Sequence, residues 1–299
     1  MTKLLDGKKI ASEIKEGIAK EVRAILEREE RPPHLAAILV GEEGASQTYV
    51  AAKEKDCHEV GFTSSVYRLP EQVKERELLD VVRFLNEDPE IDGFIVQLPL
   101  PAHIKVSRIV DAIDPAKDVD GFHPANLGRM LLNEPAYLPA TPFGIMQLIE
   151  KADIDISGKH CVVLGRSNIV GTPLSLLLSR KAKPGNATVT LCHSFTQNLE
   201  EITRTADVII AAIGVPKFLK ANMVKKGAVV IDVGIHRVPD TSRTSGYALL
   251  GDVDFEEVAP LTSLITPVPG GVGPMTRVGL LINTLRAYRK EVYPNPHTS

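Results

Sequence analysis

The feature that most constrains the fold is an alternation between helical periodicity and short, unbroken apolar runs. In residues 3–30, apolar side chains recur every three or four positions, which predicts an amphipathic helix. The segment Leu35–Val40 is wholly apolar and is closed by Gly41, which predicts a strand buried on both faces of a parallel sheet. The same patterns predict helices at 46–60 and 75–86, and strands at 65–69 and 93–98. This order indicates an α/β layer structure with right-handed crossovers.

A second, more regular alternation follows a proline-rich stretch at 114–142. Its predicted helices are 143–152, 169–180 and 199–205, and its predicted strands are 161–165, 188–191, 208–213 and 228–233. This pattern is typical of a doubly wound, Rossmann-like domain. A last helix, 279–291, has no strand after it, so we expect it to pack on the first domain or at the domain junction. Two stretches, 182–186 and 237–247, are expected to be surface loops.

We therefore expect an α/β protein of two domains. The first comprises residues 1–140 and is completed by a C-terminal helical segment, 276–299. The second, residues 141–275, is expected to be the Rossmann-like domain. A length of 299 residues fits two domains better than one.

Composition narrows the function classes. The formal net charge is −3 and there is no Trp, which disfavours a nucleic-acid partner or a polybasic membrane binder. No apolar stretch has the length of a membrane span, and no signal-peptide pattern is visible at the start. The three cysteines form no C-x-x-C pair, which argues against disulfides and zinc and favours a reducing, cytoplasmic environment.

The segment Val162–Gly171 has the order strand, tight turn, helix. Gly165 would permit the turn, and Gly171 would let helix and strand pack closely, so that backbone N–H groups face a pyrophosphate. The pattern departs from the full G-x-G-x-x-G, and a plain strand–helix turn is the alternative. The strands that follow at nucleotide-domain spacing favour dinucleotide binding.

The residues at the end of the next strand indicate which dinucleotide binds. An NAD site usually carries a carboxylate about 20 residues after the turn. Here the strand 188–191 ends in Cys192, His193 and Ser194, without a carboxylate. A cation at Arg166 and a hydroxyl at Ser194 suit a 2′-phosphate, so NADP is favoured over NAD. A solvated arginine and a helix-capping serine are the alternatives.

In the first domain, Tyr49 and Lys53 lie four residues apart on one face of a predicted helix. A partly desolvated lysine can act as an acid or base near neutral pH, although a solvated lysine is the commoner outcome. Gln97 ends a buried strand, at the edge where ligand groups usually lie. Asp118 and Asp120 flank a turn: they could simply cap it, or they could bind a guanidine-like heterocycle.

The segment Thr266–Thr276 is rich in glycine and proline and is expected to be neither helix nor central strand. Glycine permits close backbone approach and proline stiffens a loop, so a ligand-contacting loop is favoured. The histidines are scattered, and no metal-binding spacing is found.

Five segments, in this order, resemble the bifunctional methylenetetrahydrofolate dehydrogenase/methenyltetrahydrofolate cyclohydrolase family. They are Tyr49–Lys53, Val96–Pro101, Lys117–His123, Gly165–Gly171 and Thr266–Thr276. The resemblance covers nearly the whole chain. It implies NADP-dependent oxidation of 5,10-methylenetetrahydrofolate and hydrolysis of the methenyl product to 10-formyltetrahydrofolate. It also implies an active-site cleft between the two domains, and a homodimer.

The resemblance assigns roles to individual residues. Lys53 would be the acid–base group of hydrolysis, Tyr49 would position the folate and tune Lys53, Gln97 would hold Lys53, and Asp120 would bind the pterin. The cofactor-binding residues would be Gly165, Arg166, Ser167, Ser194 and Ile235, and the residues that border the folate and the nicotinamide would be Pro269, Gly270 and Gly271. Two other classes remain open: a malic-enzyme- or amino-acid-dehydrogenase-like oxidoreductase, and a nucleotide-sensing regulator without catalysis.

Overall fold

The computed structural model describes residues 3–242 and 246–294, and its backbone contacts divide the chain into two compact units. Unit 1 contains the chain up to Ser12 together with Thr141–Thr276, and unit 2 contains Glu13–Ala140 together with the chain from Arg277 on. The expected domains and these contact units differ at the N-terminus, because a short first strand pairs within unit 1. Parts of the expected loop and C-terminal segment, 243–245 and 295–299, lie outside the described residues.

Unit 2 is built on a parallel sheet of three strands in the order β3-β2-β4. The bounds are β2 His34–Val40, β3 Thr63–Leu69, β4 Gly93–Val96, α2 Gly44–Val60, α3 Glu75–Glu87, α4 Val106–Ala112 and α5 Pro124–Leu131. Two long helices, α1 (Gly7–Glu27) and α10 (Val272–Tyr288), begin in unit 1 and continue into unit 2.

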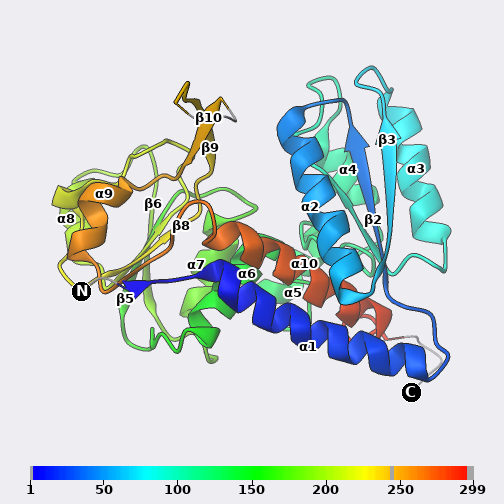
Figure 1. Ribbon diagram of the computed structural model, residues 1–299, viewed down its shortest axis with the longest axis horizontal. Coiled ribbons are helices and arrows are strands. Elements are labelled where there is room, and N and C mark those ends of the chain that lie inside the picture. The colour runs from blue at the N-terminus through cyan, green and yellow to red at the C-terminus, as the bar shows by residue number, and fades with distance from the viewer. Residues whose placement is uncertain (1–2, 243–245, 295–299) are drawn as a thin grey trace. The chain divides into compact units, whose positions relative to one another are not determined.

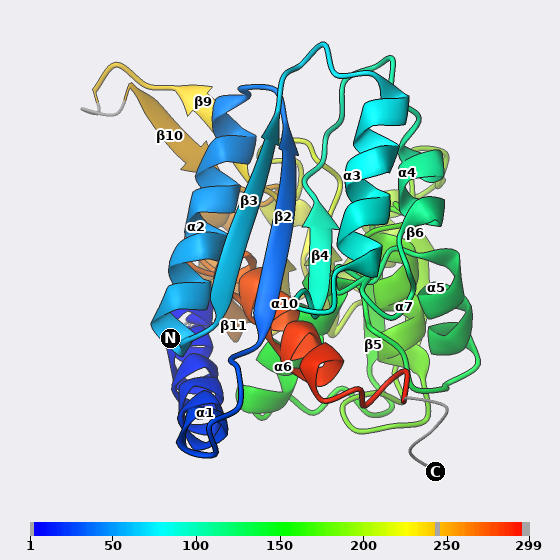
Figure 2. The same ribbon diagram turned by 90° about the vertical axis from the view of Figure 1, so that its right-hand side faces the viewer.

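Alternate residues of β2 enter two separate cores. Leu35, Ala37 and Leu39 pack with residues of α1, α2 and α10, whereas Ala36, Ile38 and Val40 pack with α3 and the segment around α4. Figure 1 shows α2 and α3 on opposite sides of this sheet, and Figure 2 shows its three strands side by side. The unbroken apolar run thus has the double burial that its composition predicts.

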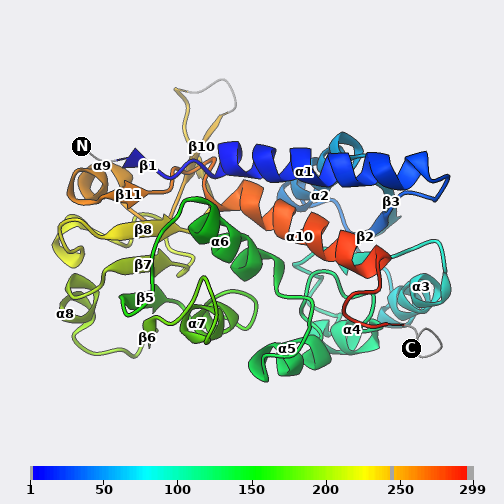
Figure 3. The ribbon, with the colours of Figure 1, turned by 90° about the horizontal axis from the view of Figure 1, so that it is seen from below.

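Unit 1 contains a sheet of six parallel strands in the order β1-β11-β8-β7-β5-β6 (Figure 3). Its elements are β1 Lys3–Leu4, α6 Ala140–Lys151, β5 His160–Leu164, α7 Gly171–Ser179, β6 Thr188–Cys192, α8 Leu199–Arg204, β7 Val208–Ala211, η1 Ala221–Met223, β8 Val229–Asp232, α9 Phe255–Val258, η2 Ala259–Leu261 and β11 Leu264–Ile265. Helices α6 and α7 lie on one side of the sheet, and α8 and α9 on the other (Figures 1 and 3). Because β5 lies between β6 and β7, the strand order reverses there, which confirms the doubly wound prediction.

Two local predictions are wrong. The stretch 237–247, expected to be a loop, contributes to an antiparallel pair, β9 (His236–Pro239) with β10 (Tyr247–Leu250). Strands this short carry too few residues for an alternation to be recognised. The glycine- and proline-rich segment was expected to exclude helix, yet α10 begins at Val272, so that Pro274 lies in its first turn. Proline is tolerated there because the first N–H groups of a helix have no partner within it.

No helix within the described ranges combines the length and apolar character needed to cross a membrane.

Candidate active site

The side chain of Lys53 is hydrogen-bonded to Gln97 inside unit 2. Lys53 lies in α2, and Gln97 follows the last residue of β4, where its backbone N–H still donates to the carbonyl of Ile38 at 2.9 Å. The Gln97 amide nitrogen donates to the carbonyl of Leu98 at 2.7 Å, so its oxygen Oε1 accepts from Lys53 Nζ at 3.1 Å. The strand end therefore offers Lys53 a neutral and oriented partner.

The surroundings of Lys53 shift its pKa downward. Burial lowers the pKa of Lys53, while the carboxylate of Asp120 opposes that shift and the positive charge of Arg277 reinforces it. Burial also raises the pKa of Asp120, and Lys53 opposes this. An amine that loses its proton more readily than an ordinary lysine is better suited to act as an acid or base.

The two carboxylates of the Asp118–Asp120 segment have different surroundings. Asp118 accepts from the backbone N–H groups of Phe122 at 3.2 Å and His123 at 2.8 Å, and from Asn126 Nδ2 at 2.9 Å. Asp118 is therefore the residue that caps the turn. Asp120 is half-buried, and within the described chain its side chain accepts no hydrogen bond, which leaves it available to a ligand.

Tyr49 lies one helical turn before Lys53 in α2 and is half-buried. Helix α2 ends at Gly61, whose φ of 86° is left-handed and favours glycine. One helix thus supplies both members of the predicted Tyr–Lys pair, and β4 supplies the amide.

In unit 1, Gly165 and Gly171 form the turn between β5 and α7. Gly165 has a φ of 109°, and a Cβ there would lie 2.1 Å from the carbonyl oxygen of Ala212 after β7. A Cβ on Gly171 would lie 1.8 Å from the carbonyl oxygen of Gly165. Neither position has room for a side chain, so the turn lies flat against β7 at the point where the strand order reverses. Ligands bind at this point in doubly wound sheets.

The other predicted cofactor residues lie at the same edge of the sheet. The hydroxyl of Ser167 accepts from the N–H of Val170 at 3.2 Å and stabilises the start of α7. Leu164 of β5 is paired with Cys192 of β6, so Arg166 and Ser194 each lie two residues beyond neighbouring strand ends, and both are exposed. Ile235 follows β8 and is 44% exposed.

The segment 266–271 is closely packed within unit 1. A Cβ on Gly271 would lie 2.6 Å from Thr266 Cβ, and a Cβ on Gly7 would lie 1.9 Å from the carbonyl oxygen of Gly271. The carbonyl of Gly270 accepts from the N–H of Lys8 at 2.9 Å, and Pro269 is exposed. Packing alone therefore explains Gly271, whereas Pro269 and Gly270 remain accessible to a ligand.

Two buried clusters were missed by sequence reasoning. Asp252 accepts from the N–H groups of Ile213 and Gly214, which follow β7, and from His236 Nε2 at 2.7 Å. Asp56, in unit 2, is paired with Arg277 and Lys15. The sequence holds only weak signals of these two clusters. Asp252 lies in a Gly-Asp-Val-Asp segment, and Arg277 directly follows the glycine- and proline-rich segment.

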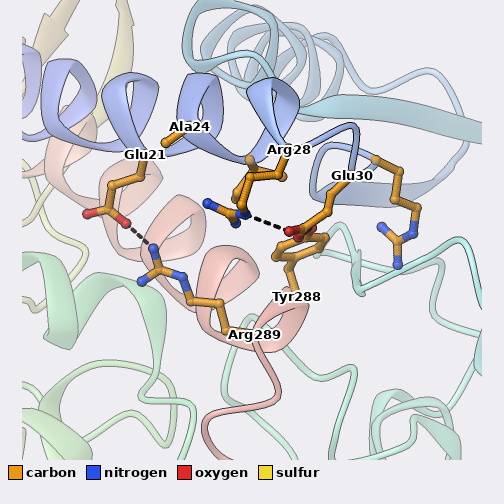
Figure 4. A pocket seen from close by; sticks show the side chains of 8 residues that line it. Glu21, Ala24, Arg28, Glu30, Tyr288 and Arg289 are labelled. Atoms are coloured by element: carbon orange, nitrogen blue, oxygen red, sulfur yellow. Dashed lines mark hydrogen bonds and ion pairs between the residues drawn. The ribbon is translucent and has the colours of Figure 1, made fainter.

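A hollow in unit 2 contains none of the predicted site residues. Figure 4 shows that its charged residues pair with one another, Arg28 with Glu30 and Arg289 with Glu21. Its other lining residues are Ala24, Ile25, Arg31 and Tyr288. Within the described part of the chain, no group of three or more His, Cys, Asp or Glu side chains is arranged to hold a metal ion.

A glycine turn at the reversal point of a parallel sheet, in a chain whose other unit holds a half-buried lysine bonded to an amide, is the arrangement of a dinucleotide-binding α/β protein. Two family models cover most of the chain: the tetrahydrofolate dehydrogenase/cyclohydrolase catalytic domain matches residues 5–120, and the NAD(P)-binding domain of the same family matches residues 139–292. The chain belongs to the tetrahydrofolate dehydrogenase/cyclohydrolase family.

Individual relatives agree with the family models. The chain is 60% identical to the bifunctional protein FolD of Cytophaga hutchinsonii over 284 residues, which cover 95% of this chain and 98% of that protein. Its fold matches the crystal structure of the bifunctional FolD enzyme of Campylobacter jejuni with a TM-score of 0.90, 45% identity and coverage of 97% and 100%. It also matches the Trypanosoma brucei dehydrogenase-cyclohydrolase complexed with NADP and inhibitor, with a TM-score of 0.91, 38% identity and coverage of 98% and 99%.

Proposed function

We propose that this chain acts on one-carbon units carried by tetrahydrofolate in two consecutive reactions. It oxidises 5,10-methylenetetrahydrofolate with NADP⁺, and it hydrolyses the resulting 5,10-methenyl cation to 10-formyltetrahydrofolate. The observation that carries this proposal is the hydrogen bond of Lys53 to Gln97, with Asp120 close enough to influence the pKa of Lys53. That arrangement provides a proton acceptor for the hydrolytic step.

The residues of unit 1 fit a dinucleotide. Gly165 and Gly171 have no space for a side chain, and the N-terminus of α7 directly follows the turn that they bound. Ser167 and Ile235 would complete the lining. Arg166 and Ser194 would bind the 2′-phosphate of NADP, because neighbouring strand ends carry them and no carboxylate stands beside them. Bound there, the nicotinamide supplies the hydride acceptor.

In the hydrolytic step, water attacks the methenyl carbon and transfers a proton to the neutral amine of Lys53. The ammonium then protonates N5 of the folate as the carbon–N5 bond breaks, and the hydroxyl proton of the carbinol leaves to solvent. One proton is therefore released for each water consumed. Gln97 holds the amine, Tyr49 positions the folate ring, and Asp120 binds the amino edge of the pterin. Pro269, Gly270 and Gly271 border the folate and the nicotinamide.

The finer assignments of assembly and location are also part of this proposal. Family resemblance supports a homodimer, and the absence of C-x-x-C pairs supports a reducing compartment, the cytoplasm. The proposed domain limits, 140 and 275, follow the sequence pattern.

The proposal is tested with purified wild type and the variant Lys53→Met. NADPH formation from methylenetetrahydrofolate and loss of the methenyl absorbance are followed separately. We expect cyclohydrolase kcat/KM to fall by at least about a hundredfold, because general base catalysis typically contributes that much. Lys55→Met is the matched control, since Lys55 is an exposed lysine of the same helix.

A folded Lys53→Met variant that retains full cyclohydrolase activity would exclude the assigned role of Lys53. A wild-type chain that reduces no NADP⁺ with methylenetetrahydrofolate would exclude the enzymatic proposal as a whole and favour a nucleotide sensor.

A further inference from the structure

In unit 2, a cluster of charged residues joins the helix that carries Lys53 to two other helices. Asp56, three residues after Lys53 in α2, accepts from Arg277 Nε of α10 and from Lys15 Nζ of α1 at 3.0 Å. Lys15 also donates to Glu59 at 2.7 Å. The cluster thus connects α1, α2 and α10.

The cluster holds Arg277 in a fixed place. The Asp56 side chain is only 8% exposed, and both of its oxygens are occupied by cations. Breaking a buried ion pair leaves an uncompensated charge, which is strongly unfavourable. The side chain of Arg277 is 24% exposed, and its guanidinium is therefore not free to rotate into solvent.

The charges that act on Lys53 oppose one another. Burial has the largest effect and lowers its pKa; Asp120 and, less strongly, Cys57 raise it, and Arg277 lowers it. Tyr49 lies one turn away on the same helix, and the direct hydrogen-bond partner, Gln97, is uncharged. Arg277 is thus the cation that counteracts the carboxylate of Asp120.

We propose that Arg277 is a positioning residue that acts through Lys53, and that Asp56 and Lys15 hold its charge where it keeps the amine in the proton-accepting form. The inference rests on the proposed function, since it concerns the base of the hydrolytic step. Its consequence is that Asp120 can lie near the amine, available to the pterin, without converting Lys53 into a permanent ammonium.

The test is the pH profile of cyclohydrolase kcat/KM for Arg277→Met and Arg277→Lys. Loss of the cation raises the pKa of Lys53, and a base works only when neutral, so the acidic limb of the profile moves to higher pH. We expect a shift of about one pH unit for Arg277→Met, from the Coulomb energy of a nearby charge in a partly buried site. Arg277→Lys keeps the charge and should restore most of the wild-type profile.

Arg286→Met provides the matched control, because Arg286 lies on the same helix with the same exposed fraction, 24%, and bonds Ala136 and Glu291 instead. If Arg277→Met does not fold, the double variant Asp56→Asn/Arg277→Met removes both partners and should show a smaller shift in the same direction.

An unchanged acidic limb in a folded Arg277→Met variant, or in the double variant, overturns the inference. So does an Arg277→Lys profile that coincides with that of Arg277→Met. Either result leaves the proposed function standing if wild type is active and Lys53→Met is not. An inactive wild type contradicts the proposed function itself.

Discussion

At the scale of single residues, the proposed hydrolytic step depends on Gln97, the uncharged side chain that is hydrogen-bonded to Lys53. Most buried lysines are paired with carboxylates, which stabilise the ammonium. Here the hydrogen bond goes to the amide oxygen of Gln97, and the nearby carboxylate of Asp56 is occupied by Arg277 and Lys15. The amine therefore has a defined position, and its direct hydrogen-bond partner does not keep it charged; the charge that favours the ammonium comes from Asp120.

The variant Gln97→Glu tests whether the partner of Lys53 must be uncharged, because it keeps the shape of the Gln97 side chain and adds a carboxylate beside Lys53. We expect the ammonium to be stabilised, and cyclohydrolase kcat/KM at pH 7 to fall at least about tenfold, with the optimum moved to higher pH. Gln97→Ala should lose activity without that pH shift. Equal pH profiles for the Glu and Ala variants would contradict the argument.

The preference for NADP is tested by Ser194→Asp, which places a carboxylate where the 2′-phosphate is expected. Repulsion should lower kcat/KM for NADP about a hundredfold and affect NAD much less. Thr188→Asp at the opposite end of β6 introduces the same charge on an exposed residue and serves as the control. A preference for NADP that survives in Ser194→Asp would refute the assignment.

The sequence predicted Lys53 and Gln97 because spacing on a helix and the end of an apolar run can be recognised in one dimension. It could not predict Arg277 and Asp56, whose pairing joins positions 221 residues apart in the chain. Nor could it separate Asp118 from Asp120, since only the folded turn shows which carboxylate receives the backbone N–H groups.

At the scale of elements, the predicted strands are all present. Wholly apolar runs mark buried strands such as β2, whereas β3 and β6 mix polar and apolar residues and are only partly buried. Four short strands, β1, β9, β10 and β11, were not predicted; they have two to four residues each, whereas the equally short β4, β7 and β8 were recognised as apolar runs. Elements of that length exist because of their partners rather than their own periodicity.

The turn between β5 and α7 provides the test at this scale. Gly171→Ala adds a methyl group where a Cβ would lie 1.8 Å from the carbonyl oxygen of Gly165. We expect a loss of about 2 kcal/mol in the free energy of unfolding and weaker NADP binding. Gly17→Ala in α1, where a Cβ meets nothing within 4 Å, should instead stabilise the chain by about 0.5–1 kcal/mol. Urea unfolding and cofactor titration distinguish the two, and an unaffected Gly171→Ala would show that the turn is not close-packed.

At the scale of the whole molecule, buried carboxyl groups determine how stability depends on pH. Burial raises the pKa of Asp232 to about 6, although it accepts from the N–H groups of Gly234, Asp252 and Val253. Its folded pKa lies above that of the unfolded chain. Between the two values the folded protein therefore retains a proton that the unfolded chain has lost, and this contribution to stability disappears as pH rises through 6.

The variant Asp232→Asn cannot take up this proton. Relative to the variant, wild type should gain about 1 kcal/mol in the free energy of unfolding when the pH falls from 7 to 5. Urea unfolding at both pH values measures the difference. A difference that is the same at both values, or larger at pH 7, would contradict the raised pKa of Asp232.

The pairing of Lys3 and Leu4 with Leu264 and Ile265 has a practical consequence for anyone who dissects this chain. An excised fragment that starts at Thr141 would leave one side of β11 without its neighbour. Unpaired strand borders recruit other molecules and promote aggregation. A recombinant cofactor-binding half should therefore carry the first dozen residues, fused ahead of it by a linker.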